Sequence, residues 1–197
     1  MDANATDTDS SDRETTPAVA SLKHYARILH RRIQQGEPQA VRTLRALREF
    51  ADTDPARLPD AIQRKHCLTV TALQLGFQSW PHALEVLEGT ETAEDFGKLL
   101  YPSTCHGHYN IWSASYDEAR GIRQEHGGYL LAYRRQFLIV DHNYIESMGL
   151  DPADPDWEAI GRDWVKPNDL AARARLYEKL VHNALVRSAL SDTRPPR

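Results

Sequence analysis

The chain has 197 residues, of which 41% are hydrophobic and 26% are charged, and its net charge is −4. This composition is typical of a folded globular protein and excludes a fully disordered chain. No apolar run approaches the roughly 18 residues that a membrane-spanning helix needs, so we expect no membrane partner.

The charges are distributed unevenly along the chain. Residues 1–20 carry five acidic side chains and one basic side chain, and we expect them to form a disordered acidic tail. This tail lacks the apolar stretch of a secretion signal, and the chain has only two cysteines, which together predict a cytoplasmic location. Residues 21–66 have ten Lys and Arg against five Asp and Glu, whereas residues 85–170 have seven against sixteen.

Apolar spacing and stop signals predict a basic module of four helices over residues 21–90. Leu22, Ala26, Leu29 and Ile33 follow helical spacing up to the stop at Gly36. The four expected helices run from Ser21 to Gly36, from Pro38 to about Phe50, from Asp60 to Leu75 before Gly76, and from Trp80 to Glu88 after a Ser79 cap.

An acidic α+β domain is expected over residues 91–190, and a frayed tail over residues 191–197. Its expected strands are Asn110–Ala114 and a hairpin of Tyr129–Tyr133 and Gln136–Asp141 that turns at Arg134-Arg135. Its expected helices are Thr92–Leu100, a helix from the Ser115 cap to Gly127, Asn143–Met148, and a long one from an Asn168 cap to about Leu190. The predicted fold class is therefore α+β, with a helical module, a short antiparallel sheet and a long C-terminal helix.

Two rows of basic residues in the helical module form a candidate binding surface. The rows are Lys23, Arg27 and Arg31, and Arg42, Arg45 and Arg48. Spacings of four and three residues place each row on one helix face, where it could contact nucleic-acid phosphates without reading sequence. The alternative interpretation is that these are solvated faces, or that they pair with the acidic domain.

The segment Cys105-His106-Gly107-His108 is the densest group of metal-capable side chains. Cys105, His106 and His108 could supply part of a zinc site, which distant residues such as His126 would have to complete. Cys105 could instead be a nucleophile activated by a nearby histidine. A purely structural loop is the third interpretation, and apart from zinc here the sequence indicates no cofactor.

The N-terminal part resembles a known bacterial module. Leu22-Lys23-His24-Tyr25-Ala26-Arg27 and the Gly76-Phe77-Gln78-Ser79-Trp80 turn resemble the small helical module at the N-termini of ankyrin-repeat and glyoxalase-related-superfamily proteins, over about residues 20–90. The resemblance implies a helical packing unit and no glyoxalase activity, because the metal ligands of paired βαβββ modules are not visible here. Gly128-Tyr129-Leu130-Leu131 and Gly149-Leu150-Asp151-Pro152 resemble bacterial proteins to which we can assign no activity.

The sequence favours binding over catalysis. It contains no Walker phosphate loop, dinucleotide fingerprint, zincin helix or Gly-x-Ser-x-Gly elbow. We therefore expect a non-catalytic cytoplasmic interaction or regulatory protein with a protein partner. Two alternatives stay open: a metal- or thiol-dependent enzyme centred on the Cys105–His108 loop, and nonspecific nucleic-acid binding through the arginine faces.

Overall fold

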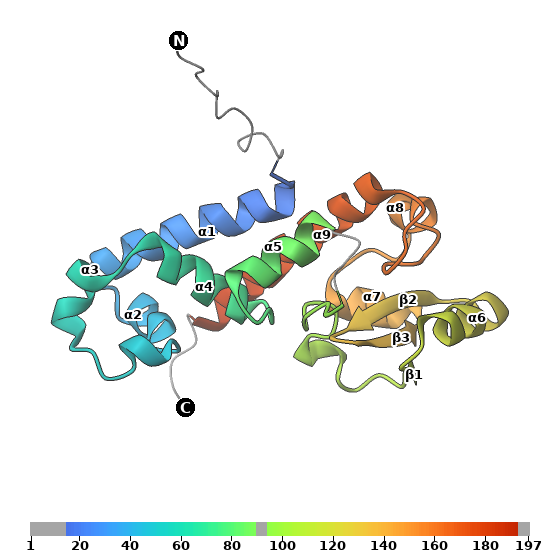
Figure 1. The fold of residues 1–197 in the computed structure, drawn as a ribbon, viewed down its shortest axis with the longest axis horizontal. Helices are drawn as coiled ribbons and strands as arrows, with labels where there is room; N and C mark the ends of the chain where they lie inside the picture. Colours follow the sequence, from blue (N-terminus) through green and yellow to red (C-terminus); the bar gives the residue numbers. More distant parts are fainter. Residues whose placement is uncertain (1–14, 90–93, 193–197) are drawn as a thin grey trace, which may run out of the picture.

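The structure, a computed structural model, describes residues 15–89 and 94–192. Its architecture is α+β, as predicted: an N-terminal group of helices, a small antiparallel sheet, and a long helix that runs from one to the other (Figure 1). Most of the expected acidic tail and most of the expected C-terminal tail lie outside the described residues. A membrane-crossing helix would need more length or apolarity than any described helix of this chain has.

The N-terminal helices begin earlier and break more often than the sequence predicts. They are α1 (Pro17–Gln34), α2 (Pro38–Leu44), α3 (Leu58–Ala61), α4 (Arg64–Gln74) and α5 (Trp80–Glu88), with single turns η1 (Arg48–Phe50) and η2 (Pro55–Arg57). Assigning residues 17–20 to a disordered tail is wrong, because the Thr16 side chain caps α1 by accepting from the Val19 amide.

The helix expected from Asp60 to Leu75 is two helices. Ile62 and Gln63 have extended backbone, and the buried Ile62 side chain packs into the helical core. The Gln63 amide donates to His66 Nδ1 at 3.0 Å, and this bond caps the N-terminus of a new helix, α4. The stop predicted at Gly76 is confirmed, and Gly89 ends α5 directly after the predicted last residue Glu88, since both glycines have the positive φ that ends a helix.

The C-terminal part contains the predicted sheet and three of the four predicted helices. Its elements are η3 (Ser103–Cys105), β1 (Ile111–Ser113), α6 (Tyr116–His126), β2 (Tyr129–Tyr133), β3 (Gln136–Val140), α7 (His142–Met148), α8 (Pro155–Ala159) and α9 (Leu170–Asp192). The strand order is β1-β3-β2, with both pairs antiparallel and Trp112 opposite Leu138. The predicted hairpin is confirmed, and its turn residue Arg134 takes a positive φ.

The helix expected over Thr92–Leu100 is not formed by its described residues. Residues 94–100 instead make turns whose backbone bonds go to other elements: the Phe96 amide donates to the Arg134 carbonyl, and the Lys98 amide to the Gly76 carbonyl. Asp95 caps the Gly97 amide and also accepts from Gln78. The segment therefore ties the turn between α4 and α5 to the hairpin tip.

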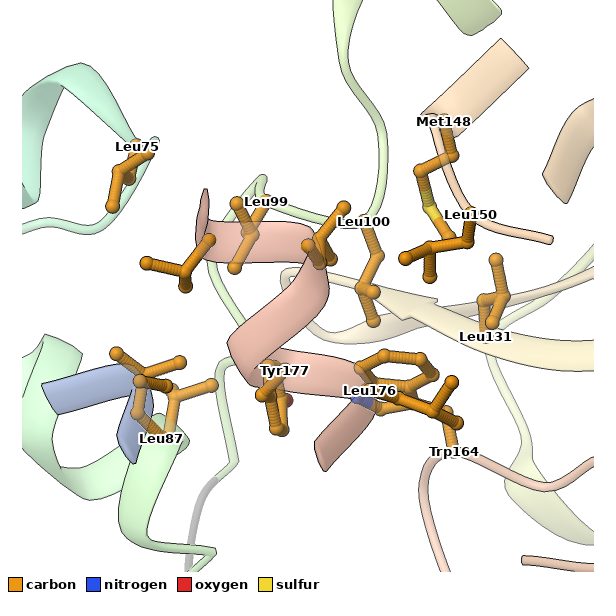
Figure 2. Close-up of a cluster of buried hydrophobic side chains, with 14 of the residues drawn as sticks. Leu75, Leu87, Leu99, Leu100, Leu131, Met148, Leu150, Trp164, Leu176 and Tyr177 are labelled. Atoms are coloured by element: carbon orange, nitrogen blue, oxygen red, sulfur yellow. The ribbon is translucent and has the colours of Figure 1, made fainter. Parts of the chain in front are cut away.

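One hydrophobic core joins the two parts of the molecule. Helix α9 packs along α1 and α5, and its residues Leu176 and Tyr177 lie between Leu87 of the helical part and Leu131 of the sheet (Figure 2). Trp157, Ile160 and Trp164 are also buried in this core. The C-terminal helix thus belongs as much to the helical module as to the domain that precedes it.

Candidate protein interaction surface

The Cys105 thiol is buried in the loop that the sequence offered as a candidate metal or thiol site. Its side chain has no exposed surface, and its Sγ lies 3.8 Å from the Tyr144 carbonyl oxygen. Burial raises the pKa of the Cys105 thiol above its usual value, although hydrogen bonds with Thr104 and Tyr144 act in the opposite direction. The thiolate, which is the reactive form, is therefore disfavoured.

The two histidines of this loop point to different partners. His106 stacks on Tyr101 with ring centroids 4.9 Å apart, and His108 Nε2 lies 2.9 Å from Ser147 Oγ. Within the described residues, no three His, Cys, Asp or Glu side chains gather closely enough to hold a metal ion. The contacts of Cys105, His106 and His108 instead fasten the loop to α7 and to Tyr101.

Because Cys105 is inaccessible, we expect iodoacetamide to label it at least about tenfold more slowly in the native protein than in urea. Mass spectrometry of tryptic peptides distinguishes Cys105 from Cys67, which is also a buried free thiol. Native labelling at the unfolded rate would contradict the buried environment and would support the thiol-enzyme alternative.

Four aromatic side chains meet beside this loop on one face of the sheet. Tyr101 contacts His106, Trp112 and Tyr133 in turn, with ring centroids 4.9 Å, 5.3 Å and 5.1 Å away. Trp112 and Tyr133 also contact each other at 5.9 Å. Trp112 is 40% exposed and His106 is exposed, so these rings form a surface patch, which we call the aromatic patch.

The aromatic patch borders an open sheet edge. β1 lies at the rim of the sheet (Figure 1), and among the described residues its backbone pairs only with β3. Ile111, on the face opposite Trp112, is 46% exposed, and Tyr109 just before the strand is fully exposed. Residues 109–115 contain no charge and no proline, the usual features that block pairing at an edge.

The other edge of the sheet is covered by the chain itself. The Leu130 amide of β2 donates to the Arg162 carbonyl at 2.9 Å, and the Trp164 amide donates back to the Leu130 carbonyl at 2.9 Å. The segment around Asp163 thus runs parallel to β2 as a short bridge. Among the described residues, the outer backbone of β2 therefore has hydrogen-bond partners beyond the sheet, whereas the outer backbone of β1 has none.

The first predicted row of basic residues lies on α1. Arg27 and Arg31 are exposed, and Lys23 is half-buried and donates to the Thr15 hydroxyl. The Arg27 Nε group donates to the Lys23 carbonyl at 3.4 Å. The row therefore shares one helix face, as its spacing predicts.

The second predicted row is divided between two elements. α2 ends at Leu44, so Arg45 lies beyond it and Arg48 begins η1. Arg42 donates to Gln39, while Arg45 folds back to donate to the Thr53 carbonyl at 2.8 Å. The expectation of one continuous helix face for this row is wrong, because the chain turns before the row is complete.

Sequence reasoning did not mark the residues of the edge and the aromatic patch. The sequence places Ile111, Trp112 and Tyr133 in expected strands, but no motif indicates that they lie at an open edge or beside Tyr101. The available signal was the uncharged segment 109–115 in a chain of which 26% is charged.

Neither a protein-family model, nor a curated protein, nor a solved structure matches this chain. The resemblance to the helical module of ankyrin-repeat and glyoxalase-related-superfamily proteins therefore stays a prediction, and function has to be argued from the geometry.

Proposed function

We propose that this chain is a non-catalytic interaction protein that binds an extended segment of a protein partner along β1. The observation that carries the proposal is the open edge of β1, flanked by Trp112 on one face and Ile111 on the other. A strand added at such an edge gains backbone hydrogen bonds from the edge and side-chain contacts from both faces. The cytoplasmic location is part of the proposal, since the free thiols of Cys67 and Cys105 suit a reducing compartment.

The aromatic patch supplies the apolar contacts that such a complex needs. Tyr and Trp dominate binding energy at protein interfaces because they bury a large area with few rotatable bonds. Trp112 is held by Tyr101 and Tyr133, so it loses little side-chain freedom when a partner covers it. Tyr109 is free to close over a bound strand from the adjacent loop.

An extended partner segment fits this surface better than a second copy of the chain. β1 is three residues long, so pairing of two β1 strands gives only a few backbone hydrogen bonds. A stable dimer buries about 1,200 Å² or more, which such a short pairing does not supply. A flexible segment can pair with β1 and then continue across the aromatic patch towards Tyr133.

The test is selection from a random peptide library displayed on phage, using the full chain as bait. We expect the selected peptides to alternate apolar and polar residues and to bind with a dissociation constant of about 1–100 µM. Trp112→Ser should weaken their binding at least about tenfold. The matched control is Ile28→Ser, since Ile28 on α1 is also 40% exposed but lies away from the sheet.

Peptides that bind Trp112→Ser as tightly as the wild type would refute the proposal. Light scattering coupled to size-exclusion chromatography tests whether two copies of the chain pair through β1. A dimer that dissociates in the Ile111→Lys variant would show that β1 pairs with itself. That result would overturn the proposal that β1 binds an extended segment of a different protein.

A further inference from the structure

The backbone hydrogen bonds of the central strand β3 alternate between its two neighbours. Tyr133 and Gln136 are the pair that closes the two-residue hairpin turn between β2 and β3. Such a closing pair exchanges both of its backbone hydrogen bonds, and bonded and non-bonded pairs then alternate along the ladder. From Gln136 on, every second residue of β3 therefore points its amide and carbonyl to β2, whereas Phe137 and Ile139 point theirs to β1.

This alternation decides which residue of β1 faces the open edge. Ile111 and Ser113 lie opposite the two β3 residues that point to β1, so their amides and carbonyls bond to β3. Trp112 lies between them, so its amide and carbonyl point away from β3 (Figure 1). Among the described residues, no backbone group outside the sheet bonds to Trp112. Trp112 is thus the one residue of this three-residue strand whose amide and carbonyl both face outward.

The other edge of the sheet follows the same alternation. Leu130 of β2 lies opposite Ile139, in a pair that does not exchange hydrogen bonds, so the Leu130 amide and carbonyl should point outward. The Leu130 amide indeed donates to the Arg162 carbonyl, and the Leu130 carbonyl accepts from the Trp164 amide, both at 2.9 Å. A segment of this chain therefore bonds to Leu130 as an external strand would bond to Trp112.

A single outward residue favours an antiparallel partner strand. In an antiparallel pair, one partner residue accepts from the Trp112 amide and donates to the Trp112 carbonyl. A parallel strand makes these two bonds with two different residues, and its pairing is less stable per residue. Since each residue that a flexible segment orders costs conformational entropy, the antiparallel arrangement gains both bonds at the smaller cost.

The partner residue that bonds to Trp112 also places its side chain on the aromatic patch. Residues directly opposite each other in a sheet share a face, and their neighbours point to the other face. The partner side chain therefore lies beside the Trp112 ring, which is 40% exposed. Aromatic and β-branched side chains stabilise such a pair with an aromatic residue. The two neighbouring partner residues point their amides away from β1, so proline is tolerated at both positions.

We propose, as a step that rests on the proposed function, that the partner segment runs antiparallel to β1 and anchors on Trp112 through one residue. This anchor residue has a free amide and an aromatic or β-branched side chain, and each of its two neighbours can be proline.

The test is N-methylation of single residues along a peptide selected on the full chain. The anchor is identified first, as the residue whose replacement by Ala weakens binding to the wild type but not to Trp112→Ser. N-methylation of the anchor removes its amide donor and should weaken binding at least about tenfold. N-methylation of either neighbour, or its replacement by proline, should change the affinity less than about threefold.

The opposite pattern, with methylation tolerated at the anchor and harmful at a neighbour, would show a parallel strand and would overturn the proposal. A peptide that tolerates methylation at every position would overturn it too, because no backbone bond would then hold the peptide. Peptides that bind independently of Trp112 would instead refute binding at β1 itself, so failure of the proposed function is distinguishable from failure of the strand direction.

Amide hydrogen exchange of the free chain checks the outward position of Trp112 without any partner. After correction for intrinsic rates, the Trp112 amide should exchange at least about tenfold faster than the amides of Ile111 and Ser113, which donate to β3. Exchange at Trp112 as slow as at its two neighbours would overturn the proposal, whatever the peptides show.

Discussion

Trp164→Ala is expected to lower the free energy of unfolding by about 3–5 kcal/mol, because it removes the largest side chain at the junction of the sheet and α9. Trp164 is fully buried, and its ring contacts Trp157 and Tyr177 at centroid distances of 5.4 Å and 4.8 Å. Figure 2 shows Trp164 beside Leu176 in this cluster of buried side chains. Its backbone also closes the β2 edge through Leu130.

Urea denaturation followed by circular dichroism measures this loss. The matched control is Trp112→Ala, since Trp112 is 40% exposed and should cost only about 1 kcal/mol. Equal losses for the two variants would contradict the assignment of Trp164 to the core and Trp112 to the surface.

The second large effect is expected at Tyr144, the residue beneath the Cys105–His108 loop. Tyr144 is fully buried, its hydroxyl donates to the Leu100 carbonyl at 2.8 Å, and its ring packs against His108. Tyr144→Ala should cost about 3–5 kcal/mol through the cavity it leaves. Tyr144→Phe keeps the packing and should cost about 1–2 kcal/mol, because the Leu100 carbonyl loses its donor.

The two Tyr144 variants also separate stability from binding. Tyr144→Ala removes the support of Tyr101 and of the loop, so it should weaken binding of the peptides selected on β1, whereas Tyr144→Phe should preserve it. Peptide titration at a temperature where both variants are folded measures this. Unchanged binding by Tyr144→Ala would show that the loop does not support the aromatic patch.

Elements set by local signals could be predicted from the sequence. Ser79 and Ser115 cap α5 and α6 through hydrogen bonds to amides three residues on, as their spacing indicates. α7 ends at Met148, as predicted, and Gly149 follows it with a positive φ. The long C-terminal helix is also present, although its first amides are capped by Asp169 and not by the predicted Asn168.

Elements that depend on distant contacts could not be predicted in this way. The Thr92–Leu100 segment has helical cap signals, yet Phe96 and Lys98 find backbone partners in the hairpin tip and at Gly76. The division of the 60–75 helix lies at Ile62 and Gln63, whose extended backbone no local spacing reveals. Tertiary contacts override propensity at both places.

The candidate site depends on the same long-range information. Trp112 and Leu138 are both apolar strand residues, but one lies on the edge strand and is exposed, while the other lies on the central strand and is buried. Strand order decides between these outcomes, and a sequence pattern does not specify it.

The most direct test of the account is amide hydrogen exchange of the full chain with and without a peptide selected on it. Pairing of the peptide with β1 predicts new protection at the amides of residues 110–114, while α1 and α9 keep their exchange rates. Protection on the α1 or α9 surface with none at β1 would contradict the claim that this open edge is where the protein binds its partner.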